Sequence, residues 1–305
     1  MCILLTDGIS NNNMTHDEEK ESDEVEYGGI PSISALAQAL TDGRYKNIMV
    51  LSGAGISCSA GIPDFRSPDC GLYHKVDKYN LPCPEAAFDL TYYHNNPAPF
   101  ISLASEIWPK EEEHTPTLTH SFVSLLHQKG LLLRNYTQNI DMLESRAGVP
   151  QDKIVECHGS FRTASCIECY EEFDIEECRR LMIDEKEAPL CQTCFALVKP
   201  DIVFAGESLP FRFDRLLRDD LQHVDLLIVI GTSLSVEPVS QIPNMIPQSC
   251  PRVLLNKELV GDFDANVGRD FFMKGNCDDN VRELSKLMGL IQELEDLNKS
   301  TAQQS

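Results

Sequence analysis

The sequence predicts an α/β fold built on a doubly wound, Rossmann-like parallel sheet with a second, smaller module. Short apolar runs of strand length alternate with segments of helical periodicity, which is typical of a parallel sheet covered on both faces. A glycine-rich turn follows the first run, as it does where such sheets bind phosphate groups. Two pairs of cysteines interrupt the alternation and indicate that the smaller module is an insertion.

The first predicted helix follows an acidic segment. Residues 1–28 are polar, acidic and rich in asparagine, and we expect them to form a disordered tail. Apolar residues then recur at helical spacing from Ile33 to Leu40, and Gly43 is the expected end of this helix.

Six apolar runs are predicted to form strands. Each is nearly continuous in apolar residues, as expected of strands that are buried on both faces. The runs are residues 47–52, 131–136, 154–158, 202–204, 226–230 and 253–255.

Two further helices are predicted from the same periodicity. Thr115 and Pro116 are the expected N-cap and first turn of a helix that has an apolar face and ends at Gly130. Residues 285–305 are expected to form a helix that frays into a polar tail.

The charge of the chain argues against some classes of partner. A formal net charge of −22 disfavours a nucleic-acid-binding protein, because phosphate backbones require cationic surfaces. An acidic surface suits Lys- and Arg-rich protein tails, although solubility alone explains it equally well. No apolar stretch approaches the roughly 18 residues of a membrane helix, so we expect no membrane span.

Paired cysteines predict a structural zinc site. Two Cys-x2-Cys pairs, separated by 21 residues, can present four thiolates tetrahedrally to one Zn²⁺ and leave no open position for chemistry. Twelve cysteines without an export signal indicate reduced thiols rather than disulfides. Cys157 and Cys178 lie near the pairs and are either extra ligands or small buried side chains. The four expected ligands are Cys166, Cys169, Cys191 and Cys194.

The glycine-rich turn is the first candidate ligand site. Segment 53–57 (GAGIS) would let backbone N–H groups, with the N-terminus of a following helix, approach a pyrophosphate. Cys58 stands where the dehydrogenase pattern requires a third glycine, so the segment alone fits an ordinary tight turn equally well. Asp64, Phe65 and Arg66 follow, where Arg66 could meet a phosphate and Phe65 could wall a ring pocket.

Polar residues also stand at the ends of predicted strands, where ligands bind in open α/β sheets. Segment 137–141 (TQNID) offers amides for ribose hydroxyls and an aspartate for amide N–H groups, or it is a polar turn that caps a helix. His158 ends the next strand beside Gly159, a good position for a general base, although most single histidines are structural. Segments 231–233 (GTS) and 256–258 (NKE) end two further strands.

Taken together, these motifs resemble those of the sirtuins, which are NAD-dependent protein deacylases. The resemblance covers about residues 30–290 in order, and it is greatest to class I, in the type-2, largely cytoplasmic branch. The matching stretches are GAGISCSAGIPDFRS (53–67), TQNID (137–141), HG (158–159), the four cysteines, VKPDIVFAGE (198–207), GTSL (231–234) and NKE (256–258).

The resemblance implies a domain plan. A catalytic domain over residues 29–290 would lie between the acidic tail, 1–28, and a C-terminal tail, 291–305. The NAD-binding, Rossmann-like parts would be about 30–70, 130–160 and 200–280, and the smaller zinc-binding and helical module about 70–115 and 160–200, with a zinc ribbon at 166–194.

The resemblance also assigns residues to the cofactor. Residues that would line the pyrophosphate and border the flexible cofactor loop are Ala54, Gly55, Ser57, Asp64, Phe65 and Arg66. Residues that would contact the nicotinamide ribose and hold the carboxamide are Gln138, Asn139, Ile140 and Asp141. Residues that would hold the phosphates and the adenosine are Gly231, Thr232, Ser233, Asn256, Lys257, Glu258 and Cys277.

The implied substrate is a peptide that adds as a strand to residues 203–207. Ala205 stands where relatives often have Phe, which would widen the peptide groove, and the short stretch 259–274 leaves the adenosine contacts open. The implied groove residues are Val203, Phe204, Ala205, Gly206 and Glu207, and the acyl-lysine tunnel would lie near Phe65, Phe88, Phe100, Ile202 and Phe204.

The implied reaction uses NAD to remove acyl groups, either acetyl or long-chain fatty acyl, from protein lysine. It yields nicotinamide and O-acyl-ADP-ribose, with His158 as general base on a ribose hydroxyl and Asn139 orienting the ribose or a water. The cofactors would be NAD and Zn²⁺, and the partners acylated proteins such as histone or tubulin tails, without nucleic acid or membrane. The resemblance implies the cytoplasm as the location, with the nucleus as a second one.

Three other interpretations share parts of the pattern. A dehydrogenase is disfavoured by the missing third glycine and by the four-cysteine insertion. An ADP-ribosyltransferase shares the NAD site and would transfer label from NAD onto protein. A scaffold without catalysis has no need of the base, the amides and the aspartate.

Overall fold

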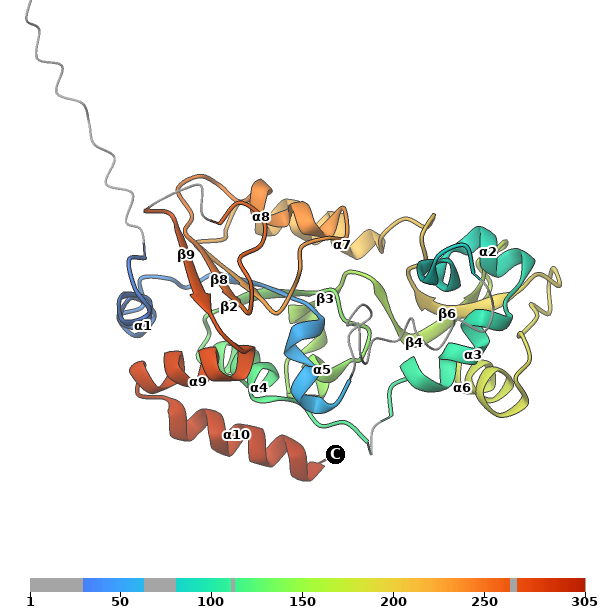
Figure 1. The fold of residues 1–305 in the computed structure, drawn as a ribbon, viewed down its shortest axis with the longest axis horizontal. Coiled ribbons are helices and arrows are strands. Elements are labelled where there is room, and N and C mark those ends of the chain that lie inside the picture. The colour runs from blue at the N-terminus through green and yellow to red at the C-terminus, as the bar shows by residue number, and fades with distance from the viewer. Residues whose placement is uncertain (1–29, 63–80, 111–112, 264–267, 305) are drawn as a thin grey trace, which may run out of the picture.

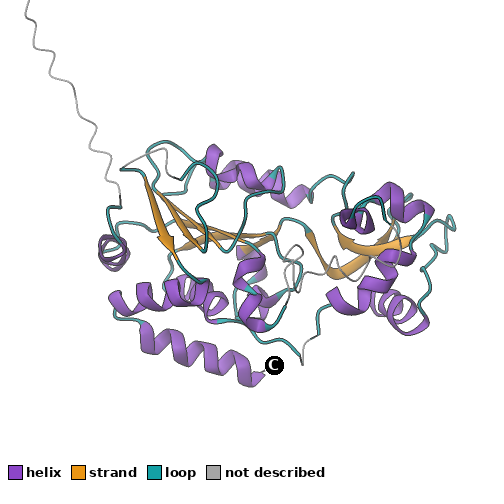
Figure 2. Ribbon diagram, viewed as in Figure 1, coloured by secondary structure: helices purple, strands orange, loops and turns teal. Residues whose placement is uncertain are grey.

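The computed structural model describes residues 30–62, 81–110, 113–263 and 268–304. The expectations for residues 1–28 and for Asp64, Phe65 and Arg66 therefore lie outside the described residues. Figures 1 and 2 show a large sheet between two layers of helices, and beside it a smaller group of helices and strands. In this part of the chain, no helix combines the length and the apolar character needed to span a membrane.

The large sheet has six parallel strands in the order β3-β2-β1-β7-β8-β9. β1 lies between β2 and β7, so the chain extends the sheet in both directions from its first strand. This is the doubly wound, Rossmann-like arrangement that the sequence predicts. The strands are β1 Ile48–Ser52, β2 Leu132–Thr137, β3 Ile154–Glu156, β7 Leu226–Ile230, β8 Arg252–Asn256 and β9 Asp270–Lys274.

Helices cover both faces of this sheet because successive side chains of a strand point to opposite sides. In β1, Ile48 and Val50 join one hydrophobic core, and Met49 and Leu51 join the other. The helices on the first side are α1 Ile33–Thr41, α4 Leu118–Gln128, α9 Cys277–Leu287 and α10 Ile291–Gln304, and those on the second are α7 Phe211–Asp220 and α8 Ile242–Met245 (Figure 1).

The smaller module is built on a three-stranded antiparallel sheet in the order β5-β4-β6. Its core contains an aromatic cluster in which the rings of Phe100 and Phe204 lie 4.9 Å apart, edge to face. Its elements are β4 Gly159–Cys166, β5 Glu172–Phe173, β6 Val198–Ile202, α2 Leu90–Asn95, α3 Ala98–Ile107, α6 Ile175–Arg179 and a π-helical turn, η6 Arg180–Glu185. Shorter elements are α5 Leu143–Arg146 and the 3₁₀ turns η1 Ala54–Ile56, η2 Cys58–Ala60, η4 Pro84–Phe88, η5 Gln151–Lys153 and η7 Val239–Gln241.

Two strand predictions need correction. The run 202–204 was expected in the parallel sheet, but β6 ends at Ile202 and pairs antiparallel with β4. An apolar run shows burial and does not show which sheet buries it. β9 was missed because it lies at the edge of the sheet, where its residues are only half-buried and the sequence pattern is mixed.

The start of helix α4 also differs from the prediction. The N-cap is Thr117 rather than Thr115, and its side chain accepts a hydrogen bond from the backbone N–H of His120. The predicted end is correct, since the helix stops at Gln128 and Gly130 takes a left-handed φ of 70°.

The C-terminal segment is a second helix rather than a polar tail. α9 ends at Leu287, and α10 lies alongside α4 and α9 (Figure 1). Leu294 of α10 is fully buried, and Asn298 donates hydrogen bonds to the Pro116 carbonyl and to Ser121 Oγ, both at 3.0 Å. The segment is mostly polar and has one narrow apolar stripe, so its composition alone predicts a tail and not a packed helix.

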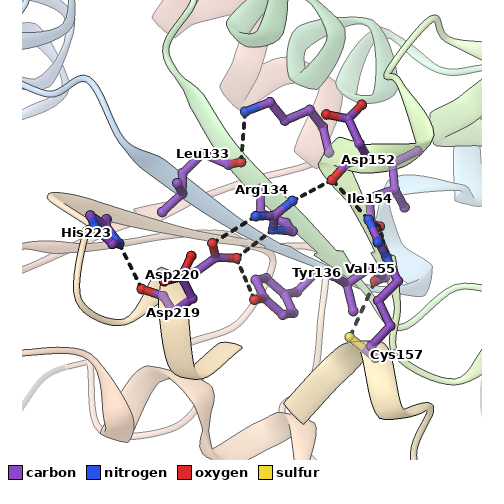
Figure 3. A network of polar contacts seen from close by, with 12 residues as sticks. Leu133, Arg134, Tyr136, Asp152, Ile154, Val155, Cys157, Asp219, Asp220 and His223 are labelled. Carbon is purple, nitrogen blue, oxygen red and sulfur yellow. Dashed lines mark hydrogen bonds and ion pairs between the residues drawn. The ribbon is translucent and has the colours of Figure 1, made fainter. Parts of the chain in front are cut away.

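A buried ion pair fixes α7 to the middle of β2 (Figure 3). Arg134 donates two hydrogen bonds to the Asp220 carboxylate, at 2.6 and 2.9 Å, and Tyr136 donates a third at 2.6 Å. Arg134 also donates to the carbonyl of Asp152, next to β3. These contacts hold the strand whose next residues carry the polar cluster.

Candidate active site at the carboxyl ends of the strands

Two glycine loops cross at the point where the strand order reverses. Gly55 donates its N–H to the Gly231 carbonyl at 2.8 Å, and a Cβ at Gly55 would lie only 2.8 Å from the Gly231 Cα. Gly231 has a φ of 63°, and a Cβ there would lie 2.7 Å from the Ile56 nitrogen. Only glycines allow two backbones to approach so closely. No side chain of Gly55 or Gly231 therefore covers the backbone of these loops at the switch point, where such sheets bind ligands.

The glycine loop leads into short 3₁₀ turns rather than a long helix. η1 and η2 follow β1 directly, and Gly61, with a φ of 82°, ends the second turn. No α-helix begins in residues 53–62, the described residues that directly follow β1. The amides of the loop are the groups that these residues offer to a phosphate.

Ser57 joins the glycine loop to the polar cluster after β2. Its hydroxyl donates to Asp141 Oδ2 at 2.6 Å and accepts from Asn139 Nδ2 at 3.1 Å. Asn139 also donates to the Gly53 carbonyl at 3.2 Å, and Asp141 Oδ1 accepts from the Leu143 N–H at 3.0 Å. Three residues predicted for the site, Ser57, Asn139 and Asp141, are thus brought together, and the Ser57 hydroxyl bonds both of the others.

His120 belongs to this network although the sequence analysis gave it no role. Its Nδ1 accepts from the Thr117 N–H at 3.1 Å, so Nε2 carries the proton and lies 3.5 Å from Ser57 Oγ. Burial lowers the pKa of His120, which keeps the ring neutral. The signal that could have revealed it is the capping box from Thr117 to His120, which fixes this ring at the start of α4.

A carboxyl group lies beneath the same network. Glu144 is fully buried, and burial together with the nearby Asp141 charge raises its pKa to about 8. His120, Asp141 and Glu144 place potential metal ligands within 4.8 Å of one another. We assign them to hydrogen bonding instead, because both His120 nitrogens face hydrogen-bonding partners.

Gln138 links the polar cluster to the loop after β7. Its amide donates to Thr232 Oγ1 at 2.9 Å. Asn256, at the end of β8, donates to the Thr232 carbonyl at 3.1 Å and to the Glu258 carbonyl at 2.9 Å. The exposed residues that also follow β7 and β8 are Ser233, Lys257 and Glu258. The structure therefore brings these predicted cofactor residues together at the carboxyl ends of neighbouring strands.

Cys277 lies at the first turn of α9 and is buried. The adjacent Asp278 accepts from the Thr119 N–H at 2.9 Å and from the Ser59 hydroxyl at 2.5 Å, so it joins α9 to α4 and to the glycine loop. Cys277 is therefore held near Ser59 of η2, and its predicted contact with the adenosine stays a prediction.

His158 has the protonation state that a general base requires, a neutral ring with one unprotonated nitrogen. Its Nδ1 lies 2.9 Å from the Gln138 carbonyl, so Nδ1 carries the proton and donates it there. Nε2 is then unprotonated, and it is buried without a hydrogen-bond partner in the described part of the chain. Burial lowers the pKa of His158, which keeps the ring neutral near pH 7.

The position after His158 requires a glycine. Gly159 has a φ of 71°, and a Cβ there would lie 1.9 Å from the Asp201 carbonyl oxygen. The backbone of β6 therefore passes directly beside the histidine, and the Val203 N–H donates to the His158 carbonyl at 2.8 Å.

The predicted peptide-binding stretch, 203–207, is already paired at its centre. Ala205 donates its N–H to the Phe88 carbonyl at 2.7 Å and accepts from the Leu90 N–H at 3.0 Å. Glu207 accepts from the Phe204 N–H at 2.7 Å and forms an ion pair of 2.9 Å with the buried Lys199. A peptide that adds to this stretch must use the backbone of its other residues.

Three of the four predicted phenylalanines, Phe88, Phe100 and Phe204, lie together in the smaller module. Phe100 and Phe204 are each only 1% exposed, and Phe88 packs edge to face against both at 5.8 and 5.9 Å. Phe88 is half-buried, so among the three it offers the accessible edge. Their predicted contact with an acyl chain stays a prediction.

A pocket opens beside the polar cluster. Ser57, Asn139 and Asp141 form its polar side, and Ile107 and Trp108 at the end of α3 form its apolar side. It lies between the large sheet and the smaller module, where a planar amide-bearing ring would meet both an aspartate and an apolar wall.

The four paired cysteines meet at one point, as predicted. The Sγ atoms lie 3.4 Å apart for Cys166 and Cys194, 3.4 Å for Cys169 and Cys194, and 3.6 Å for Cys169 and Cys191. Tetrahedral Zn²⁺ with bonds of about 2.3 Å requires sulfur separations of about 3.8 Å, so the group fits zinc. Cys157 and Cys178 are buried in the hydrophobic cores and act as small apolar side chains.

Comparisons with known proteins identify the family of this chain. The model of the Sir2 family matches residues 53–238. NAD-dependent protein deacetylase hst2 of Schizosaccharomyces pombe is 48% identical over 87% of this chain and 79% of that protein. NAD-dependent deacetylase sir2A of Dictyostelium discoideum is 46% identical over 93% of this chain and 57% of that protein. NAD-dependent protein deacetylase sirtuin-2 of Danio rerio is 42% identical over 88% of this chain and 75% of that protein.

Proposed function

This chain belongs to the Sir2 family, and from that premise we infer that it uses NAD to remove acetyl groups from lysine side chains of other proteins. The observation that carries the inference is the neutral His158, whose Nδ1 is fixed on the Gln138 carbonyl and whose Nε2 is buried without a partner among the described residues. A general base at this position acts by accepting a proton from a substrate hydroxyl that lies within hydrogen-bond reach.

The residues at the switch point fit NAD. The glycine loops would let their amides reach the pyrophosphate, and Asp141 would bind the carboxamide of the nicotinamide in the pocket beside Trp108. Gln138 and Asn139 would contact the ribose, and the edge formed by Thr232 and Asn256 would hold the adenosine half. When bound, NAD supplies a ribose carbon that becomes electrophilic as nicotinamide departs.

The protein contributes proton transfer and orientation. His158 would accept a proton at Nε2 from a ribose hydroxyl, and the Gln138 carbonyl would stabilise the resulting imidazolium through Nδ1–H. Asn139 is held by Gly53 and Ser57, so its amide is preorganised to orient the ribose or a water. The products are free lysine, nicotinamide and O-acetyl-ADP-ribose.

Zinc has a structural part in this account. The four thiolates would complete its coordination and hold the two cysteine pairs together at the end of β4. A closed shell of four ligands leaves no position for a substrate, so the zinc keeps the module folded.

The finer substrate assignments are also proposals. Long-chain acyl groups are candidates because Phe88 and its neighbours could line an apolar tunnel beyond the lysine. Lys-rich tails such as those of histones or tubulin suit a chain with a net charge of −22. The cysteines of the described residues are free thiols, which supports a reducing compartment such as the cytoplasm, with the nucleus as a second location.

Mass spectrometry of peptides tests this function. Acetyl-lysine and myristoyl-lysine peptides are incubated with the zinc-loaded protein, with and without NAD. We expect NAD-dependent loss of the acetyl group with one nicotinamide and one O-acetyl-ADP-ribose per lysine. Transfer of ADP-ribose onto protein would replace this account with a transferase, and an absorbance change at 340 nm with a dehydrogenase.

A further inference from the structure

Two aromatic side chains stand almost fully in solvent at the end of the smaller module. Tyr170 is 78% exposed and Phe195 is 76% exposed. Each directly follows the second cysteine of a Cys-x2-Cys pair, Cys169 and Cys194. Leu190, which precedes the second pair, is 53% exposed. We call Tyr170, Leu190 and Phe195 the zinc tip.

The two rings are presented in equivalent ways. Tyr170 and Phe195 have φ values of 61° and 62°, and the N–H of each donates to the carbonyl of the first cysteine of its pair, at 3.2 and 3.0 Å. The Sγ atoms of Cys169 and Cys194 lie 3.4 Å apart, so both rings project from one small, rigid base. An exposed aromatic on a fixed backbone loses little freedom when it binds a partner.

The surroundings of the zinc tip are strongly acidic. Residues 168–187 contain nine acidic and three basic residues, a net charge of −6. Glu168, Glu171 and Glu172, which flank Tyr170, are exposed. Arg180 is already engaged by ion pairs with Glu177 and Glu185. A partner of this surface must therefore be cationic and must offer groups that pack on aromatic rings.

We propose that the zinc tip docks a Lys- and Arg-rich segment of the protein substrate, outside the segment that enters the active site. Guanidinium and ammonium groups pack on the faces of Tyr and Phe rings while the surrounding carboxylates attract their charge. The proposal rests on the deacetylase function, since it gives the enzyme a second contact with the same substrate.

The pairing of β4 with β6 sets the distance between the two contacts. β4 begins at Gly159, beside the base, and ends at Cys166 in the zinc site, and these residues pair with Ile202 and Val198 of β6. The register of β4 shifts between Gly159 and Ala164, so the four residue steps of β6, each about 3.3 Å, give a span of about 13 Å. An extended peptide needs about four residues to cover this distance, so a shorter link between acetyl-lysine and basic segment cannot engage both sites.

Peptides with a variable spacer test the proposal. Each carries one acetyl-lysine, a Gly/Ser spacer of about 2, 8 or 14 residues, and a segment of either five Arg or five Ser, on the amino or the carboxyl side. We expect KM to fall about tenfold for the Arg peptides with the two longer spacers, and not for the shortest spacer or the Ser peptides. The advantage should shrink in 0.5 M salt, because exposed charges are screened.

The matched variants are Tyr170→Ser with Phe195→Ser, and Phe211→Ser as a control. Phe211 is 79% exposed at the start of α7, outside the zinc module. The double variant should lose the advantage of the Arg peptides and keep the kcat and KM of the short peptide, its zinc content and its Tm. The control should keep the advantage.

Several outcomes would overturn the proposal. They are an equal KM for Arg and Ser peptides with the native protein, an advantage that persists in the double variant, a short-peptide KM that rises with it, or a change in oligomeric state, which would show that the tip contacts a second copy. Failure of the native protein to deacetylate even the short peptide is a different result, which would refute the deacetylase function itself.

Discussion

Strand β2 carries two buried polar networks of opposite character. In its middle, Arg134 and Tyr136 meet Asp220, and each oxygen of that carboxylate is engaged by a donor (Figure 3). Just beyond its carboxyl end, the Gln138 carbonyl accepts from His158 Nδ1, which leaves the His158 Nε2 buried and without a partner among the described residues.

The network around Asp220 stabilises the fold, and the contacts around His158 prepare a group for chemistry. A satisfied buried network is stable as it stands and gains nothing from a ligand. An unpartnered buried nitrogen costs free energy until a hydrogen-bonding group reaches it. Asn135 Nδ2 of β2 also lacks a partner among the described residues, so it is the neutral imidazole of His158, which can accept a proton, that indicates chemistry. The four cysteines belong with the first kind, since four ligands complete one metal shell.

The largest expected effect is on the zinc site. Cys191→Ser removes one of four thiolates, and zinc contributes on the order of 10 kcal/mol to the folding of small zinc modules. We expect loss of bound metal together with unfolding or aggregation, measured by metal analysis and thermal melting. Cys83→Ser, at an exposed cysteine outside the cluster, is the control and should change neither. A variant that binds no metal and melts as the native protein does would contradict this.

The open network is tested by His158→Ala. Loss of a general base costs about 10²–10⁴ in kcat, and we expect this loss with Tm and zinc content unchanged. His223→Ala is the control, because His223 is exposed and donates only to a backbone carbonyl. Near-normal turnover of the His158 variant would remove His158 from the reaction.

The satisfied network is tested by Asp220→Ala. It leaves Arg134 buried without its partner, and breaking a buried ion pair costs about 3–5 kcal/mol of stability. We expect a lower denaturant midpoint and an unchanged kcat for the folded fraction, the reverse of the His158 result. The control is Asp219→Ala, at the exposed neighbour. If Asp220→Ala lowered kcat and left stability intact, the division between the two networks would be wrong.

The smallest effect, taken per pH unit, is a pH dependence from Glu144. Its pKa is about 8 in the folded protein against 4.5 for the free side chain, so between these values the folded state holds a proton that the unfolded state has lost. Stability should therefore fall as pH rises from about 4.5 to 8, by on the order of 1 kcal/mol per pH unit from this group. Glu144→Gln, which resembles the protonated acid, should be less sensitive. Denaturant unfolding at pH 5, 6.5 and 8 measures this, and equal slopes for both proteins would contradict it.

Local patterns in the sequence predicted most of the sheet and much of the site. The run 226–230 is a strand of the predicted length because five consecutive apolar residues require burial on both faces. The glycine loop, His158 and the cysteine pairs were found because each obeys a local rule of spacing or position. Their predicted contacts with NAD and substrate remain predictions.

Contacts between distant segments could not be predicted in the same way. Arg134 and Asp220 lie 86 residues apart, and neither stands in a recognisable motif. His120 gained its place through a helix start that was predicted two residues too early. Asn298 shows the same limit, because a polar helix looks like a tail until its carbonyl and hydroxyl partners are placed beside it.

The central claim is that His158 is neutral, with its proton on Nδ1 and a buried, unprotonated Nε2. ¹⁵N NMR of the imidazole nitrogens measures this directly, with His158→Ala identifying the signals. At pH 7.5 we predict a protonated Nδ1 bonded to the Gln138 carbonyl and an unprotonated Nε2. A proton on Nε2, or on both nitrogens, would contradict the account.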